Sequence, residues 1–163
     1  MTRTQKKKLS VTDKSCDIVK LVTALDDRFQ VPVPSNEDLV KVQERMLEMP
    51  QTLVSVDHFI HAGMYSRTIM IQAGVVLIGA AMNNDSVCIS SGDITVTTDD
   101  GVHRFTGYHV IPALAGKKRV GLAHQDTYWT SVFRSNASTV EEAEMEMTNE
   151  YEKLQTRVRL CQE

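Results

Sequence analysis

The spacing of apolar residues at the start of the chain predicts two helices. From Asp13 onward, apolar side chains recur every three or four positions, the period of one helix face. These positions are Ile18, Leu21, Val22, Leu25 and Phe29. The run Val31-Pro32-Val33-Pro34 ends this helix, because proline lacks an N–H donor and restricts the residue before it. Ser35 and Asp38 then form a capping-box pattern for a second helix, which Pro50 ends.

After Pro50 the period changes to two, the period of a β-strand. The predicted strands cover residues 53–56, 68–72, 75–81, 87–90, 93–98, 102–106, 108–111, 118–123 and 127–134. Turns are predicted at Ala73-Gly74, Asn83-Asn84-Asp85, Ser91-Gly92, Asp99-Asp100-Gly101, Gly107 and Ala115-Gly116. Of these, Asp100-Gly101 is the strongest hairpin signal. Short antiparallel strands with turns at this spacing predict a mainly β domain, a small barrel or jelly roll.

The end of the chain predicts one long amphipathic helix. Thr139 and Glu142 form a capping box. An apolar stripe then follows at steps of three or four: Val140, Ala143, Met147, Tyr151, Leu154, Val158 and Cys161. A helix of about 22 residues would be about 33 Å long, more than the side of a small barrel needs for cover. It either packs within the subunit or pairs with a second copy as a short coiled coil.

The resulting organisation has four parts: a flexible basic tail at 1–12, a helical arm at 13–50, a β barrel at 51–137 and a C-terminal helix at 138–163. Composition supports these boundaries, because all 8 glycines lie in the barrel segment while residues 53–136 contain no glutamate. The 163 residues are 42% hydrophobic and 24% charged, as in a globular domain. A net charge of −3 argues against a nucleic-acid partner.

Further signals bear on the compartment. No apolar run follows the basic start, so we expect no secretory signal. The longest apolar stretch, residues 74–82, is about half of a membrane span, so no membrane partner is expected. Cys16, Cys88 and Cys161 are far apart and odd in number, which favours a reducing compartment.

Catalytic and metal-binding patterns are weak in this sequence. His58 and His61 are three apart and would face opposite sides of a strand. His103, His109 and His124 have no paired spacing either, so no metal and no cofactor are predicted. Cys88 lies in an apolar strand, where burial raises a thiol pKa and makes it unreactive. We therefore predict no catalytic residues, although an enzyme is not excluded.

A basic and aromatic set within the barrel segment suggests binding of an anionic or planar ligand. Arginine binds such groups bidentately, and an aromatic face stacks on planar ones. The four residues predicted to bind this ligand are Arg67, Arg119, His124 and Trp129.

Several motifs occur in an order that resembles a known family. They are the segments 61–69, 91–96 and 115–120, and the run His124-Gln125-Asp126-Thr127-Tyr128-Trp129-Thr130. Over residues 46–144 the sequence is similar to cupin-like proteins encoded in tailed bacteriophage genomes, whose function is largely unassigned. The resemblance implies a cupin-like jelly-roll barrel and a phage origin. Members carry two histidines at positions that match Met82 and Ser86, and a glutamate where Gln125 stands. With these three positions changed, the resemblance implies a cupin scaffold that no longer binds a metal ion.

These patterns lead to one function and two alternatives. The first is a non-enzymatic phage protein that acts by binding and by homo-oligomeric assembly through its helices, such as a capsid or tail accessory component in contact with other virion proteins. The second is an anti-defence protein that sequesters an anionic, nucleotide-like small molecule. A cupin metalloenzyme is the third. The expected location is the host bacterial cytoplasm or the virion.

Overall fold

The computed structural model describes Val22 and residues 33–156. The predicted basic tail, the first predicted helix apart from Val22, and residues 157–163 lie outside the described residues. No helix within the described part of the chain is long and apolar enough to cross a membrane.

The second predicted helix is confirmed as α2, which spans Asn36–Leu47. Ser35 caps it as the sequence predicts: its hydroxyl accepts from the Asp38 backbone N–H, and the Asp38 carboxylate accepts from the Ser35 N–H. The face bearing Leu39 and Val42 is buried against Val120. Asn36 adds a polar connection, because its side chain donates to the Gly116 carbonyl and accepts from the Lys118 N–H. This helix is therefore fixed to the loop that leads into the sheet.

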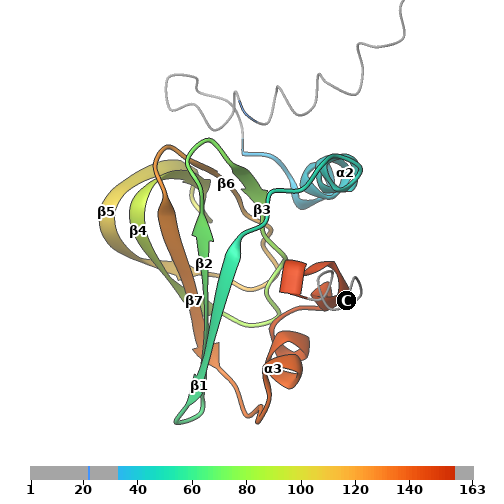
Figure 1. The fold of residues 1–163 in the computed structure, drawn as a ribbon, viewed down its shortest axis with the longest axis vertical. Coiled ribbons are helices and arrows are strands. Elements are labelled where there is room, and N and C mark those ends of the chain that lie inside the picture. The colour runs from blue at the N-terminus through green and yellow to red at the C-terminus, as the bar shows by residue number, and fades with distance from the viewer. Residues whose placement is uncertain (1–21, 23–32, 157–163) are drawn as a thin grey trace, which may run out of the picture.

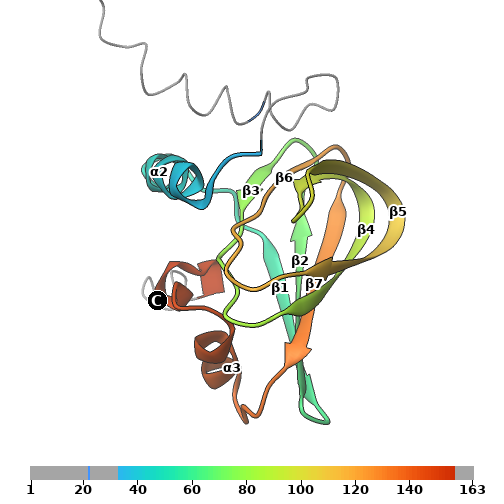
Figure 2. The same cartoon turned by 180° about the vertical axis from the view of Figure 1, so that it is seen from behind.

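The mainly β prediction is confirmed by a seven-stranded antiparallel sheet. Its strands are β1 (Ser55–His61), β2 (Met64–Ile71), β3 (Val76–Ile78), β4 (Ser86–Thr97), β5 (Val102–Ala113), β6 (Val120–Ala123) and β7 (Thr127–Arg134). The order is β1-β2-β7-β4-β6-β3, and β5 pairs with β4. Figures 1 and 2 show the sheet curling into a half-barrel, with α2 and the C-terminal helical segments opposite β4 and β5.

The prediction of turns at Ser91-Gly92 and Gly107 is wrong. Each lies inside a single 12-residue strand, and Gly92 pairs with Gly107 across the β4–β5 hairpin. Both glycines have positive φ, 146° and 86°, which bends the two strands without ending them. The bend divides β4: residues 87–91 pair with β7, and residues 94–96 pair with β6. Glycine at these positions therefore produces the curl of the sheet.

Tight turns join the strands of the β4–β5 and β1–β2 hairpins. The predicted Asp100-Gly101 hairpin is confirmed, and the Thr98 N–H donates to the Gly101 carbonyl. The sequence reading missed the β1–β2 hairpin, whose turn residues Ala62 and Gly63 have φ of 50° and 74°. Positive φ at two central residues is the geometry that matches the twist of paired strands.

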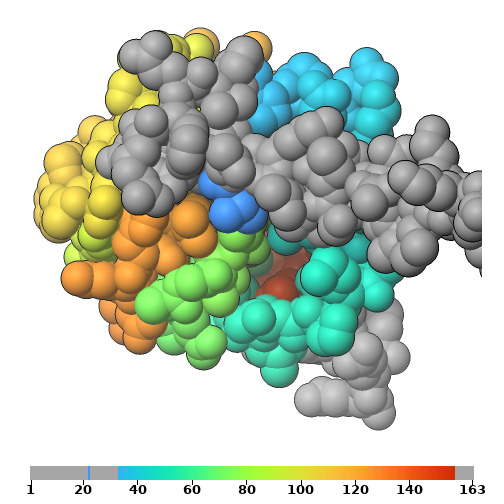
Figure 3. Space-filling view, turned by 90° about the horizontal axis from the view of Figure 1, so that it is seen from above, coloured from blue at the N-terminus to red at the C-terminus, as the bar shows by residue number. Residues whose placement is uncertain are grey.

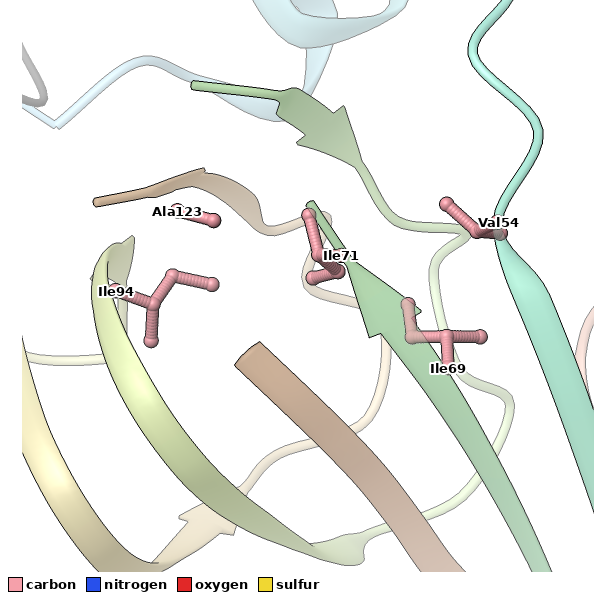
Figure 4. Packing of buried hydrophobic residues seen from close by; sticks show 5 residues of the cluster. All are labelled: Val54, Ile69, Ile71, Ile94 and Ala123. Atoms are coloured by element: carbon pink, nitrogen blue, oxygen red, sulfur yellow. The ribbon is translucent and has the colours of Figure 1, made fainter. Parts of the chain in front are cut away.

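Buried apolar side chains fill part of the space inside the curl. Ile69 and Ile71 on β2, Ile94 on β4, Ala123 on β6 and Val54 just before β1 form one cluster. Figure 4 shows these five side chains projecting into the space that their elements enclose. The concave face of the sheet is therefore the core face.

The long C-terminal helix predicted from the apolar stripe is wrong. Helix α3 covers only Val140–Met147, and a 3-10 turn, η1, follows at Tyr151–Lys153. Thr148 has extended backbone, and its hydroxyl donates to the Ala81 carbonyl. This side-chain hydrogen bond competes with helix continuation, and threonine is a weak helix former.

The part of the apolar stripe that the structure describes packs within the subunit; Val158 and Cys161 lie outside the described residues. Ala143, Met147 and Leu154 pack in one buried cluster with Tyr65 and Phe133 of the sheet. Contact with the sheet therefore buries these apolar side chains. In one continuous helix they would have needed another surface to cover them.

Candidate functional site

Pairing across the sheet places a row of polar side chains on the concave face. Arg67 on β2 pairs with Ser131 on β7, which in turn pairs with Cys88 on β4. Directly paired residues project from the same face of a sheet, so these three side chains lie side by side. Ile69 and Trp129 form the next pair on this face.

These side chains line a cavity of about 470 Å³ inside the curl. Ligand pockets typically have volumes of roughly 300–1,000 Å³. Most of the wall is apolar and comes from β2, β3, β4 and the segment before β1; it includes Ile69, Ile71, Leu77, Ile94 and Val96. Residues of α2 and the segment after it, the loop before β6, and residues 147–155 contribute the remaining sides. Figure 3 shows a hollow between the teal segment near β1 and green residues, with red C-terminal residues at its floor.

Arg67 is the basic group on the β2 wall of this cavity. Its side chain is 13% exposed, and its Nε lies 3.8 Å from Glu144 Oε1. This distance permits ionic attraction but exceeds that of a hydrogen bond. Among the described residues, no acceptor pairs with the buried Nε–H. Burial lowers the pKa of the Arg67 guanidinium, and Tyr65 and Glu144 partly offset this effect. Arginine nonetheless stays charged.

Arg119 also lines the cavity but is already engaged. Its Nη2 lies 2.9 and 3.0 Å from the two carboxylate oxygens of Asp99. The neighbouring Lys118 donates from Nζ to Glu150 Oε2 at 2.6 Å. Glu150 and Lys153 form a further ion pair at 3.6 Å. Arg67 therefore differs from Arg119 and Lys118, because it lacks a hydrogen-bonded acidic partner among the described residues.

Cys88 lies next to Ser131 with a sulfur to oxygen distance of 3.8 Å. Burial raises the pKa of its thiol, and hydrogen bonding to Ser131 and the charge of Arg119 offset only part of this. The thiol is therefore protonated at neutral pH and is a poor nucleophile. Trp129 lines the same cavity and packs against the cluster that contains Cys88.

Three of the four predicted ligand-binding residues, Arg67, Arg119 and Trp129, line this single cavity. His124 does not belong to the lining. It follows β6, where its Nε2 lies 2.8 Å from Thr95 Oγ1 and its N–H donates to the Asp93 carbonyl. These contacts give His124 a role in holding β4 against the β6–β7 turn.

A divalent metal ion does not fit the cavity. Within residues 33–156, no three His, Cys, Asp or Glu side chains are grouped to hold one. The basic groups on the wall would repel a divalent cation. At the two positions matched to family histidines, Met82 packs beside the Tyr65 cluster, and Ser86 begins β4 as a buried hydroxyl.

Glu144 is the cavity neighbour that sequence reasoning missed. It is 1% exposed on α3, and its Oε1 accepts a hydrogen bond from Thr156 Oγ1 at 2.7 Å. A signal was present: Glu144 precedes Met147 by three positions and Tyr151 by seven, which places it at the edge of the apolar stripe. A glutamate at the edge of an apolar stripe usually lies on the solvent face of its helix, so the pattern alone did not reveal the burial of Glu144.

Comparisons with known proteins find similarity to solved structures of low sequence identity. KdgF from Halomonas sp. has a TM-score of 0.44 and 12% identity over 52% of this chain and 81% of its own. A cupin superfamily protein from Desulfitobacterium hafniense DCB-2 has a TM-score of 0.44 and 13% identity, and the match covers 66% of this chain and 94% of its own. A cupin-2 domain protein from Shewanella frigidimarina NCIMB 400 has a TM-score of 0.41 and 10% identity, and the match covers 56% of this chain and 90% of its own.

No protein-family model matches the chain. No curated protein has significant sequence similarity to it. At TM-scores below 0.5 the structural similarities support no conclusion about activity. The fold class, a mainly β domain with a curled antiparallel sheet, rests on the strand pairings above.

Proposed function

We propose that the protein is a cupin-like, non-enzymatic binding protein whose cavity holds a small, largely apolar molecule. The supporting observation is the 470 Å³ cavity, which is lined mainly by aliphatic side chains. Water gains few hydrogen bonds there, so an apolar ligand would replace it at a gain in free energy. The protonated Cys88 thiol favours binding over catalysis, and the described residues contain no cluster of three His, Cys, Asp or Glu side chains that could hold a metal ion.

A fluorescent apolar probe tests this proposal. Anilinonaphthalene sulfonate should bind the folded protein with a blue-shifted, enhanced emission. Leu77→Trp places a large ring in the cavity and should weaken probe binding at least tenfold. Val110→Trp adds the same ring to an exposed position of β5 and serves as the control. Equal binding to both variants would show that the cavity is not the site.

A second candidate function, self-association, is favoured by the convex face. The convex face carries exposed apolar side chains from four strands: Phe59, Val87, Tyr108, Val110 and Tyr128. These residues are uncharged, so two copies could meet there without like-charge repulsion. The described part of the C-terminal stripe packs on its own sheet, so this proposal assigns self-association to the convex face. Assembly through the helices stays a prediction.

Light scattering at micromolar concentration tests self-association, and Tyr108→Ser with Tyr128→Ser should convert a dimer to monomers. A dimer that persists would locate the contact elsewhere.

The phage origin, the virion role and the location in the host cytoplasm or virion stay predictions. Mass spectrometry of purified virions would detect or exclude a structural role.

A further inference from the structure

We infer that the ligand of this cavity is an amphiphile with a single anionic head, a carboxylate, which binds Arg67 while its apolar body lies along β2 and β3. This inference rests on the proposed function and adds the chemistry of the ligand. It makes Arg67 the specificity-determining residue of the site.

The first step concerns unsatisfied hydrogen-bonding capacity. A guanidinium has five N–H donors in a planar fork, and burying them without acceptors costs free energy. Arg67 is 13% exposed, its Nε–H has no acceptor among the described residues, and Glu144 is 3.8 Å away. A ligand carboxylate could accept two parallel hydrogen bonds from this fork.

The second step concerns charge. On and beside the cavity wall, the basic groups are Arg67, Lys117, Lys118, Arg119 and Lys153, and the acidic groups are Asp99, Glu144 and Glu150. The surplus is positive, so one bound anion lowers the electrostatic energy of the site.

The third step concerns why the head carries one charge. Asp99 binds Arg119 through both carboxylate oxygens, and Glu150 binds Lys118. Lys117 is exposed. Of the two arginines that line the cavity, Arg67 is the one without a hydrogen-bonded carboxylate among the described residues. A dianionic phosphate there would bring a second charge into an apolar cavity without a matching donor fork.

The fourth step concerns the apolar body. Ile69 and Ile71 follow Arg67 at alternate positions of β2, so all three side chains lie on the concave face. Val75, Val76, Leu77 and Ile78 extend this wall toward β3. A chain anchored at Arg67 would therefore contact aliphatic groups along its length, and Trp129 would lie beside its head.

Isothermal titration with three eight-carbon probes separates the possibilities: octanoate, octan-1-ol and octyl phosphate. Octanoate should bind at least tenfold more tightly than octan-1-ol and at least as tightly as octyl phosphate. Arg67→Gln should weaken octanoate binding about ten- to a hundredfold and leave octan-1-ol unchanged. Arg67→Lys, which keeps the charge without the fork, should recover part of the octanoate affinity. Arg134→Gln, at an exposed position of β7, is the matched control and should change nothing.

The outcomes distinguish this inference from the proposed function. If octan-1-ol binds as tightly as octanoate and Arg67→Gln has no effect, the inference that Arg67 binds a carboxylate is wrong, whereas the proposal of an apolar binding site is retained. If octyl phosphate binds more than tenfold better than octanoate, the single-charge head is overturned. If no probe binds, the proposed function itself fails. Should Arg67→Gln not fold because it leaves the buried Glu144 without its cation, Arg67→Gln with Glu144→Gln removes both charges, and the same expectations apply.

Discussion

The concave and convex faces of the sheet are built from the same strands but meet different surroundings. On the concave face, Ile94 and Val96 are buried beside a cavity that also exposes basic groups. On the convex face, Val110 and Tyr108 are 59% and 68% exposed, and no charged residue lies between them on β5. Alternation along a strand therefore supplies two apolar faces, and only the curl determines which one encloses a site.

Replacement of the glycine that produces the curl should have the largest effect. A Cβ at Gly92 would lie 2.7 Å from the Asp126 carbonyl oxygen and the Thr127 Cα, and the φ of 146° disfavours any other residue. We expect Gly92→Ala to lower the free energy of unfolding by about 3 kcal/mol, measured by urea denaturation.

Its partner across the hairpin provides the control. Gly107 has φ of 86°, but a Cβ there would meet nothing within 4 Å. Gly107→Ala should therefore cost only about 1 kcal/mol, from backbone strain alone. Equal losses for the two variants would show that the close approach at Gly92 does not maintain the curl.

A matched pair of valines compares the two faces directly. Val96→Ala removes two methyl groups from a side chain that is 3% exposed, and should cost about 2 kcal/mol. Val110→Ala removes the same atoms from the convex face and should cost less than about 0.5 kcal/mol. Thermal and urea unfolding at low protein concentration measure both. A large loss at Val110 would indicate that the convex face is covered in solution.

The smallest effect on stability is expected from acidification, which protonates Glu150 and breaks its ion pair with Lys118 beside the cavity. Burial alone would raise the pKa of Glu150, but hydrogen bonds from Lys118 and the Ala81 N–H, with the nearby charges, hold it below its usual value. The folded state thus favours the carboxylate. The resulting stabilisation is complete above about pH 4.3 and is lost as pH falls through the lowered pKa.

Urea midpoints between pH 7 and pH 3 should decrease more steeply for the natural protein than for Glu150→Gln, which cannot titrate at this position. Parallel curves would show that the Lys118 pair contributes nothing to the acid dependence.

The sequence predicted the elements whose signals are local. The Ser35 capping box, the Asp100-Gly101 hairpin and the period-two segments correspond to observed structure. The errors occurred where tertiary contacts decide. Gly92 looked like a turn because glycine marks both turns and bends, and only the pairing of β4 with two strands distinguishes them.

The same reasoning applies to the candidate site. Residue chemistry selected Arg67, Arg119 and Trp129, which share a cavity, but also His124, which lies outside the lining. Nothing in the spacing reveals that Asp99 engages Arg119, because the two lie 20 residues apart on different segments. Glu144 was missed for the same reason, since its burial depends on where α3 docks.

The bent β4–β5 hairpin also has a consequence for the order of folding. Its two 12-residue strands are joined by a tight turn, so their pairing closes only short loops. By contrast, β2 meets β7 through pairs such as Thr68 and Thr130, which are 62 residues apart. Loop-closure entropy makes such distant pairing slow. We therefore expect the β4–β5 hairpin, like the β1–β2 hairpin, to form early, and the pairing of β2 with β7 that closes the cavity wall to form last.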